Sequence, residues 1–221
     1  MSRQTLFRGV PVGGKLVLGT FGLVAFILIF TLGLTFADTH GSSGPVFVTG
    51  DLDGDGIHEE YCLYRNQITV REGGKIIWRT PKSWSVTNFN LGDPDNDGSP
   101  NLIMSLWKEG NFGDVAPFWQ AGEDVSYKNH LFVYQLVECT AEINTENRPE
   151  NNTFKPVWCS SNLDRPIHSF TVEDVNSDGL VELVVKEGQY RRKRGGRYTL
   201  DTAGGLATTV WQWNQWGFEK L

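Results

Sequence analysis

The sequence predicts an all-β fold of three four-stranded units, preceded by one N-terminal membrane-spanning helix. An acidic, glycine-containing frame begins at Asp51, Asp93 and Asp174, and each copy leads into short apolar runs rich in β-branched and aromatic residues. Near the N-terminus, residues 16–36 form an uncharged and mostly apolar run of 21. A run of about 20 such residues spans a bilayer as a helix.

The N-terminal run is interpreted as a retained membrane anchor. Three basic residues and no acid lie within residues 1–15, so the positive-inside rule predicts a cytoplasmic N-terminus. A linker at 37–43 would then lead to an extracytoplasmic domain at 44–221. The alternative is a cleaved signal peptide and a secreted protein, because residues 35–37 (Thr-Phe-Ala) offer a cleavage site. The apolar part of a signal peptide usually spans only about 7–15 residues, which favours the anchor.

The net charge of the chain argues against polyanionic partners. The whole sequence carries a net charge of −6, and residues 1–40 contain three bases and one acid. Residues 41–221 therefore carry −8. Such a domain is not expected to seek nucleic acid or anionic lipid through its overall charge.

The acidic frames have the spacing of calcium-binding loops. Position 1 is Asp, position 3 is Asp or Asn, position 5 is Asp, position 6 is Gly, and position 9 is Glu or Asn. Calcium takes six to eight oxygen ligands at about 2.3–2.6 Å, which alternate side chains of a tight loop and the carbonyl of position 7 can supply. Glycine at position 6 permits the sharp turn. Up to three Ca²⁺ ions are therefore expected, bound by Asp51, Asp53, Asp55, Ile57 and Glu59 in loop one, by Asp93, Asp95, Asp97, Ser99 and Asn101 in loop two, and by Asp174, Asn176, Asp178, Leu180 and Glu182 in loop three.

These loops do not fit the EF-hand pattern. An EF-hand places a Glu at position 12 and a helix on each side of the loop. Position 12 is here Cys62, Met104 or Val185, and each loop leads into a run with strand character.

The frame resembles the FG-GAP/VCBS family of calcium-loop β-propeller repeats over residues 44–221. "DLDGDGIHE" matches the family's D-x-D-G-D-G-x-x-D loop closely, with Glu59 in place of the last Asp, while "DPDNDGSPN" and "DVNSDGLVE" depart at one or two positions. The resemblance implies propeller blades with the calcium loop between their first two strands. Because the family includes integrins, adhesins and lectins, it does not imply one biological role.

The apolar runs then form a propeller-like array of three blades, at about 44–80, 84–161 and 168–221. Four strands make a propeller blade. The uneven spacing of the loops is explained by insertions at 108–129, 141–153 and 187–205, or alternatively by a fourth, degenerate blade within 105–140. The expected strands are 45–50, 60–65, 67–72 and 75–80; 85–91, 101–107, 130–136 and 155–161; and 168–173, 181–187, 208–213 and 216–221.

Three tryptophans, Trp78, Trp158 and Trp216, lie in or at the start of the fourth strands and are expected to pack between blades. Propellers usually close with four to eight blades. A three-blade array is therefore expected to form an unusually small ring, to pair with another copy of the chain, or to dock on a partner.

A binding surface is expected at the end of the domain opposite the calcium loops, where the insertions between second and third strands meet. Aromatic and basic side chains there suit a glycan, an anionic polymer or a partner protein. The alternative is a solvated loop whose aromatic residues fold onto the core. The candidate residues are Trp107, Phe112, Phe118, Trp119, Arg191, Arg192, Lys193, Arg194 and Arg197.

The three cysteines, Cys62, Cys139 and Cys159, show no metal-binding spacing. Cys139 and Cys159 fall on neighbouring expected strands, so a disulfide between them and three free thiols are both open. None of the four histidines belongs to a recognisable catalytic motif.

The sequence therefore predicts a calcium-binding module, tethered to the membrane, that binds a protein or glycan at the cell surface and is not an enzyme. One alternative is an exposed accessory subunit of a larger membrane complex. Another is an enzyme that acts on a cell-wall polymer.

Overall fold

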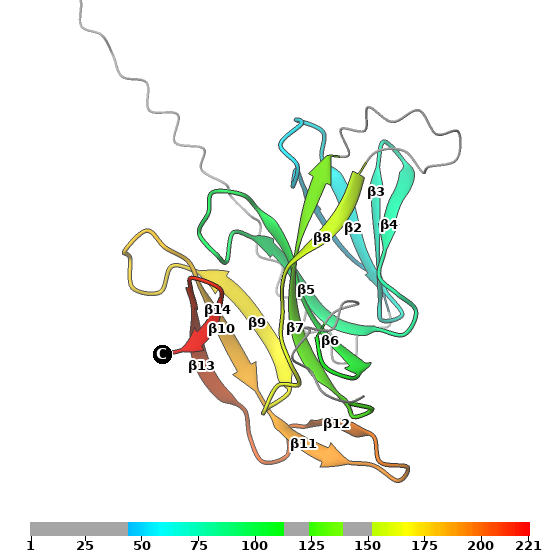
Figure 1. Cartoon of the computed structure of the whole chain (residues 1–221), viewed down its shortest axis with the longest axis vertical. Coiled ribbons are helices and arrows are strands. Elements are labelled where there is room, and N and C mark those ends of the chain that lie inside the picture. The colour runs from blue at the N-terminus through cyan, green and yellow to red at the C-terminus, as the bar shows by residue number, and fades with distance from the viewer. Residues whose placement is uncertain (1–43, 113–123, 139–151) are drawn as a thin grey trace, which may run out of the picture. The chain divides into compact units, whose positions relative to one another are not determined.

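The structure is a computed structural model and describes residues 44–112, 124–138 and 152–221 (Figure 1). Every regular element in these residues is a β-strand, and the predicted all-β class is confirmed. No helix in the described part of the chain is long and apolar enough to span a membrane. The expected anchor at 16–36 and the segments on either side of it, 1–15 and 37–43, lie outside the described residues.

Three antiparallel sheets of four strands follow one another along the chain. The A sheet contains β1 (Val46–Gly50), β2 (Glu59–Tyr64), β3 (Gln67–Glu72) and β4 (Lys75–Arg79). The B sheet contains β5 (Ser85–Gly92), β6 (Asn101–Glu109), β7 (Tyr127–Glu138) and β8 (Asn152–Cys159). The C sheet contains β9 (Ile167–Glu173), β10 (Glu182–Glu187), β13 (Ala207–Asn214) and β14 (Gly217–Lys220). Each of the twelve strands overlaps an expected one.

Tight turns set the strand order of the A sheet. Arg65 and Asn66 join β2 to β3 with φ of 48° and 62°, and Gly73 and Gly74 join β3 to β4 with φ of 54° and 81°. Two consecutive positive φ angles are typical of the type I′ turn, whose twist matches that of a β-hairpin. These local signals explain why the strands pair in sequence order.

The B sheet lies between two hydrophobic clusters. One cluster joins A-sheet residues such as Tyr61 and Ile68 to Met104 of the B sheet. The other joins Ile103, the neighbour of Met104 on β6, to C-sheet residues such as Leu183. Because both faces of the B sheet are covered, β6 is buried from its first residue to its eighth and has a continuous apolar sequence rather than an alternating one.

Two of the three fourth-strand tryptophans pack between sheets, as expected. The ring centroid of Trp78 on β4 lies 4.6 Å from that of Phe154 on β8, and that of Trp158 on β8 lies 5.2 Å from that of Phe218 on β14. The expectation for Trp216 is wrong, because this side chain is 82% exposed. Trp216 belongs to the two-residue turn between β13 and β14, and this turn leaves its indole in solvent.

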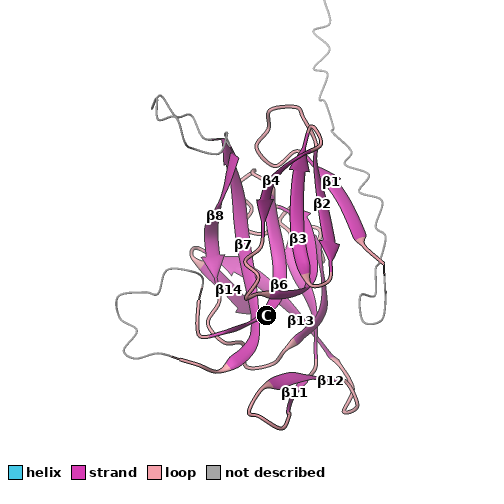
Figure 2. Ribbon diagram, turned by 90° about the vertical axis from the view of Figure 1, so that its right-hand side faces the viewer, coloured by secondary structure: helices cyan, strands magenta, loops and turns pink. Residues whose placement is uncertain are grey.

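The boundaries of the first insertion need correction. Strands β6 and β7 extend into it and pair up to Glu109 and Tyr127. Only residues 110–126 remain between them, which is too short for a four-stranded unit with strands of about five residues. A fourth blade at 105–140 is therefore excluded. The third insertion contains a two-stranded hairpin that the sequence did not predict, β11 (Gln189–Arg192) and β12 (Tyr198–Asp201), which is separate from the larger sheets (Figure 2).

Candidate metal-binding loops and the opposite surface

The three acidic loops occupy equivalent places in the fold. Loop one connects β1 to β2, loop two connects β5 to β6, and loop three connects β9 to β10. Each therefore lies between the first two strands of its sheet, where the sequence frame placed it.

The loops also share one backbone conformation. The glycines at position 6 have φ of 87°, 91° and 89° in Gly56, Gly98 and Gly179, a region that side chains disfavour. Position 4 is left-handed as well, with φ of 78°, 56° and 62° in Gly54, Asn96 and Ser177. The requirement at position 4 was not predicted. Gly and Asn are the residues that adopt this conformation most readily, and their presence at position 4 of loops one and two was the available signal.

Carboxylates hold each loop in shape. The position 1 aspartate accepts a hydrogen bond from the N–H of position 6 at 2.8–2.9 Å in all three loops. The position 5 aspartate accepts one from the N–H of position 7 at 2.7–2.8 Å. Asp side chains commonly stabilise turns in this way. These hydrogen bonds fix the turn geometry of each loop.

Loop one gathers the densest cluster. Side-chain oxygens of its four acids lie within 4.8 Å of one another, in Asp51, Asp53, Asp55 and Glu59. Glu59 is 0% exposed. Its Oε2 atom accepts hydrogen bonds from the N–H of Leu52 at 3.0 Å and from the hydroxyl of Tyr61 at 2.9 Å. Its Oε1 atom is buried and has no hydrogen-bond partner among the described residues. An unpaired buried carboxylate oxygen is costly, and a cation at the cluster would remove this cost.

Loop two also has clustered acids and buried side-chain oxygens without hydrogen-bond partners among the described residues, but it has fewer acids. Oxygens of Asp93, Asp95 and Asp97 lie within 4.8 Å of one another. Within the described part of the chain, Oδ1 of Asp95 and Oδ1 of Asn101 are both buried without a hydrogen-bond partner. The Nδ2 group of Asn101 donates to the carbonyl of Ser99 at 2.7 Å. That carbonyl, expected to be a ligand, is here engaged by the loop itself.

The pKa values of the loop acids reflect this crowding. Burial raises the pKa of Glu59, and the charges of Asp53 and Asp51 add to the effect. Burial and the neighbouring charge of Asp97 raise the pKa of Asp95 to about 6. A bound divalent cation would favour the ionised forms and reverse these shifts.

Loop three is arranged differently. The Nδ2 group of Asn176 donates to Oδ2 of Asp178 at 3.0 Å and to Oε1 of Glu182 at 3.4 Å. An amide donor therefore lies between the carboxylates, while the side chains of Asp174 and Leu180 are exposed. Of the three predicted sites, loop three therefore has the arrangement of side chains least suited to binding a cation.

The opposite end of the domain only partly matches the expected binding surface. Trp107 is just 7% exposed, and its ring centroid lies 6.1 Å from that of Tyr127 and 5.9 Å from that of Tyr190. Its expected role in binding is wrong, because the β11–β12 hairpin covers its indole. Phe112 is half-buried. Phe118 and Trp119 lie outside the described residues.

The five basic candidate residues are accessible to solvent. Arg191, Arg192, Lys193, Arg194 and Arg197 are all exposed. Arg197 lies 3.5 Å from the carboxylate of Glu109 and places its guanidinium 4.9 Å from the ring centroid of Tyr127. The hairpin therefore meets the end of the B sheet, and the expected meeting of these two regions is confirmed for the described residues. Lys128 lies over the rings of Tyr190 and Tyr198, and it is not among the residues that the sequence predicts for this surface.

The structure describes two of the three cysteines, Cys62 and Cys159. Cys62 lies in β2 and is 8% exposed, and burial raises the pKa of its thiol. Cys159 is half-buried at the end of β8. Cys139 lies outside the described residues, so its pairing with Cys159 stays a prediction.

Comparison with known proteins yielded no match to a family model, to a curated protein or to a solved structure.

Proposed function

We propose that residues 44–221 form a calcium-stabilised, propeller-like interaction module that is tethered to the membrane outside the cytoplasm and binds a protein or glycan at the cell surface. The observation that carries the calcium part is the Oε1 atom of Glu59, which is buried within a cluster of four acids and has no hydrogen-bond partner in the part of the chain that the structure describes. Calcium prefers oxygen ligands of this kind.

The order of the sheets supports a propeller-like array. Each sheet is a four-stranded antiparallel meander, and β5, the first strand of the B sheet, contacts both β1 and β9, the first strands of the other two. The last strands of the A and B sheets, β4 and β8, are also in contact. First strands that lie together are typical of blades around a common axis.

The outer face of the A sheet favours the docking of a further protein. Phe47 and Ile76 are 52% and 45% exposed, and their registers place both on the face that carries Cys62, away from Tyr61 and the core. This observation supports the second candidate function, an exposed subunit of a larger membrane complex. Co-purification of further chains after mild detergent extraction would favour that candidate over a free-standing module.

The basic hairpin provides the proposed interaction surface. The hairpin is held to the rest of the domain by hydrogen bonds, because the hydroxyl of Tyr190 donates to the carbonyl of Leu163 at 2.9 Å and accepts from the N–H of Asn129 at 3.2 Å. Its exposed cations stand out in a domain of net charge −8 and suit carboxylate or phosphate groups of a partner. Because β10 runs from loop three towards the hairpin, this surface lies at the end opposite the calcium loops.

Thermal unfolding of the detergent-solubilised chain tests the calcium proposal. Calcium that binds only the folded state, at one hundred times its Kd, would stabilise by about 2.7 kcal/mol per site, so the Tm should rise from chelator to millimolar calcium. Glu59→Gln should reduce the rise. Glu60→Gln, which changes a half-buried neighbour paired with Arg71, is the matched control and should not. An equal Tm with and without calcium would refute the proposal.

A further inference from the structure

A pocket of about 240 Å³ lies where the B and C sheets meet. Its apolar wall consists of the rings of Trp158, Trp211 and Phe218. Its polar wall consists of Glu187, Lys220 and the 160–165 segment, which connects β8 to β9. None of these residues belongs to the acidic loops or to the basic hairpin, so the pocket is a separate feature of the molecule.

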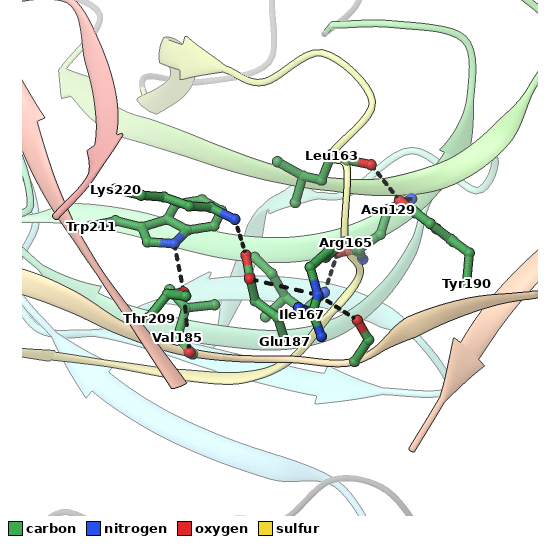
Figure 3. A network of polar contacts seen from close by, with 11 residues as sticks. Asn129, Leu163, Arg165, Ile167, Val185, Glu187, Tyr190, Thr209, Trp211 and Lys220 are labelled. Atoms are coloured by element: carbon green, nitrogen blue, oxygen red, sulfur yellow. Dashed lines mark hydrogen bonds and ion pairs between the residues drawn. The ribbon is translucent and has the colours of Figure 1, made fainter. Parts of the chain in front are cut away.

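A buried carboxylate, that of Glu187, holds the polar wall in place. Glu187 is 1% exposed, and Figure 3 shows Lys220 and Arg165 approaching its carboxylate from either side. The Nζ atom of Lys220 lies 2.6 Å from Oε1, and Nε of Arg165 lies 4.0 Å from Oε2. Nε of Arg165 also donates to the carbonyl of Gly188 at 3.1 Å. A carboxylate with these partners fixes both cationic side chains at the pocket.

The 160–165 segment is anchored as well. The hydroxyl of Ser160 accepts a hydrogen bond from the N–H of Leu131 at 3.0 Å, and the N–H of Leu163 donates to the carbonyl of Asn129 at 3.1 Å. Tyr190 binds the carbonyl of Leu163 from the other side. The walls of the pocket are therefore preformed, as binding sites for small molecules usually are.

The chemistry of the walls restricts the ligand. Two cations, Arg165 and Lys220, face two acids, Asp164 and Glu187, so the pocket has no excess charge for a phosphate or a free metal ion. The charged rim disfavours a purely apolar ligand. The volume is below the roughly 300–1,000 Å³ of pockets for drug-sized ligands. A small, uncharged ring with one apolar face and several hydroxyl groups satisfies all of these conditions.

We propose that this pocket binds one pyranose ring of a sugar, with its apolar side in the corner between the rings of Trp158 and Phe218, whose planes meet at 77°. Hydroxyl groups both donate and accept hydrogen bonds, and the rim offers both kinds of partner. Ser161 and Asp164 are exposed at the rim, and neither terminal guanidinium nitrogen of Arg165 is engaged by another described residue. The inference rests on the proposed interaction role and names a glycan as its ligand.

Ligand-detected NMR on the full chain, in detergent and with calcium, tests this assignment. The probes are the methyl glycosides of glucose, galactose, mannose and N-acetylglucosamine, together with a matching disaccharide of any glycoside that binds. We expect saturable binding of at least one glycoside. Tighter binding of the disaccharide than of the glycoside would indicate that the natural ligand is the end of a glycan chain, and equal binding would indicate a single sugar. Either result supports sugar binding in this pocket.

Two variants and one control locate the binding. Asp164→Ala and Arg165→Gln should each weaken it about tenfold, which corresponds to about 1.4 kcal/mol. Glu219→Ala removes an exposed acid from the other face of β14 and should leave binding unchanged. The Tm shift with calcium, measured on the same samples, confirms folding and tests the calcium proposal separately.

Two results would overturn the pocket assignment. One is the absence of saturable binding of every glycoside at millimolar concentration by protein that melts cooperatively. The other is binding that Asp164→Ala and Arg165→Gln leave unchanged. If calcium still raises the Tm in either case, the sugar-binding proposal is refuted and the calcium proposal stands. If the protein binds sugar but calcium does not raise the Tm, the calcium proposal is refuted and the sugar-binding proposal stands.

Discussion

The side chain of Asn96 in loop two binds both backbone groups of Val181 in loop three. Its Nδ2 group donates to the carbonyl of Val181 at 3.1 Å, and its Oδ1 atom accepts from the N–H of Val181 at 2.8 Å. Asn96 occupies position 4 of its loop, where φ is 56°, and Val181 occupies position 8. These two hydrogen bonds join loop two directly to loop three.

Asn96→Gly should uncouple the two loops. Glycine keeps the left-handed backbone, as Gly54 does at the same position of loop one, but it removes both hydrogen bonds. At about 1 kcal/mol per bond, we expect a loss of about 1–3 kcal/mol in the free energy of unfolding and weaker calcium binding at loop three. Chemical denaturation and calcium titration measure the two effects. Ser177→Gly makes the same backbone change in loop three and serves as the control; an equal effect on both variants would contradict the coupling.

Short-range patterns explain what could be predicted from the sequence. The frame beginning at Asp51 specifies its own turn, because the carboxylate and the glycine that shape it lie within nine residues. Turn residues and β-branched runs located the strands of the large sheets in the same way. The contact between Asn96 and Val181 joins residues 85 positions apart, and no local pattern encodes it.

The errors have the same origin. The local sequence indicates a surface position for Trp107, because the β11–β12 hairpin that buries it lies more than 80 residues later in the chain. The similarity of its sequence position to those of Trp78 and Trp158 predicts an interface for Trp216, but its position in a two-residue turn decides its exposure. Both side chains depend on tertiary packing or turn geometry rather than on local hydrophobicity.

The loops should differ in calcium affinity, with loop one strongest and loop three weakest. Loop one has four acids within 4.8 Å, and ligand charge tunes affinity in such loops. In loop three, Asn176 directs donor hydrogens at the carboxylates and would have to turn its amide before an ion could bind. Asp51→Ala should therefore reduce the calcium-dependent rise in Tm more than Asp174→Ala does. Loop three filling before loop one at limiting calcium would show that geometry, and not charge, sets the order.

Trp107→Ala should be strongly destabilising. The indole is 7% exposed and contacts two tyrosine rings, and replacing a buried aromatic residue by Ala costs about 3–5 kcal/mol. Trp216→Ala is the matched control, since its indole is 82% exposed, and it should change the free energy of unfolding by about 0.5 kcal/mol or less. Urea denaturation of both variants measures the difference. Similar values for the two would contradict the assignment of Trp107 to the core.

His130 should make the folded state sensitive to mild acid. The side chain is 0% exposed and its Nδ1 atom lies 3.3 Å from the carbonyl of Ser160, while Nε2 is buried and without a partner among the described residues. Burial, and to a smaller extent the charge of Lys108, lowers the pKa of His130 to about 4. The unfolded chain, with a histidine pKa of about 6.5, therefore binds more protons between these two values.

Stability from His130 is thus complete above pH about 6.5 and is lost as the pH falls towards about 4, by a total of about 3 kcal/mol. The loop acids with raised pKa values act in the opposite direction, so the histidine effect is isolated by comparing the wild type with His130→Gln in the same buffers. The wild type should lose stability relative to the variant as the pH is lowered through this range. His168→Gln changes a half-buried histidine of β9 and should track the wild type. A difference between the wild type and His130→Gln that stays constant with pH would mean that the imidazole is protonated equally in the folded and unfolded states.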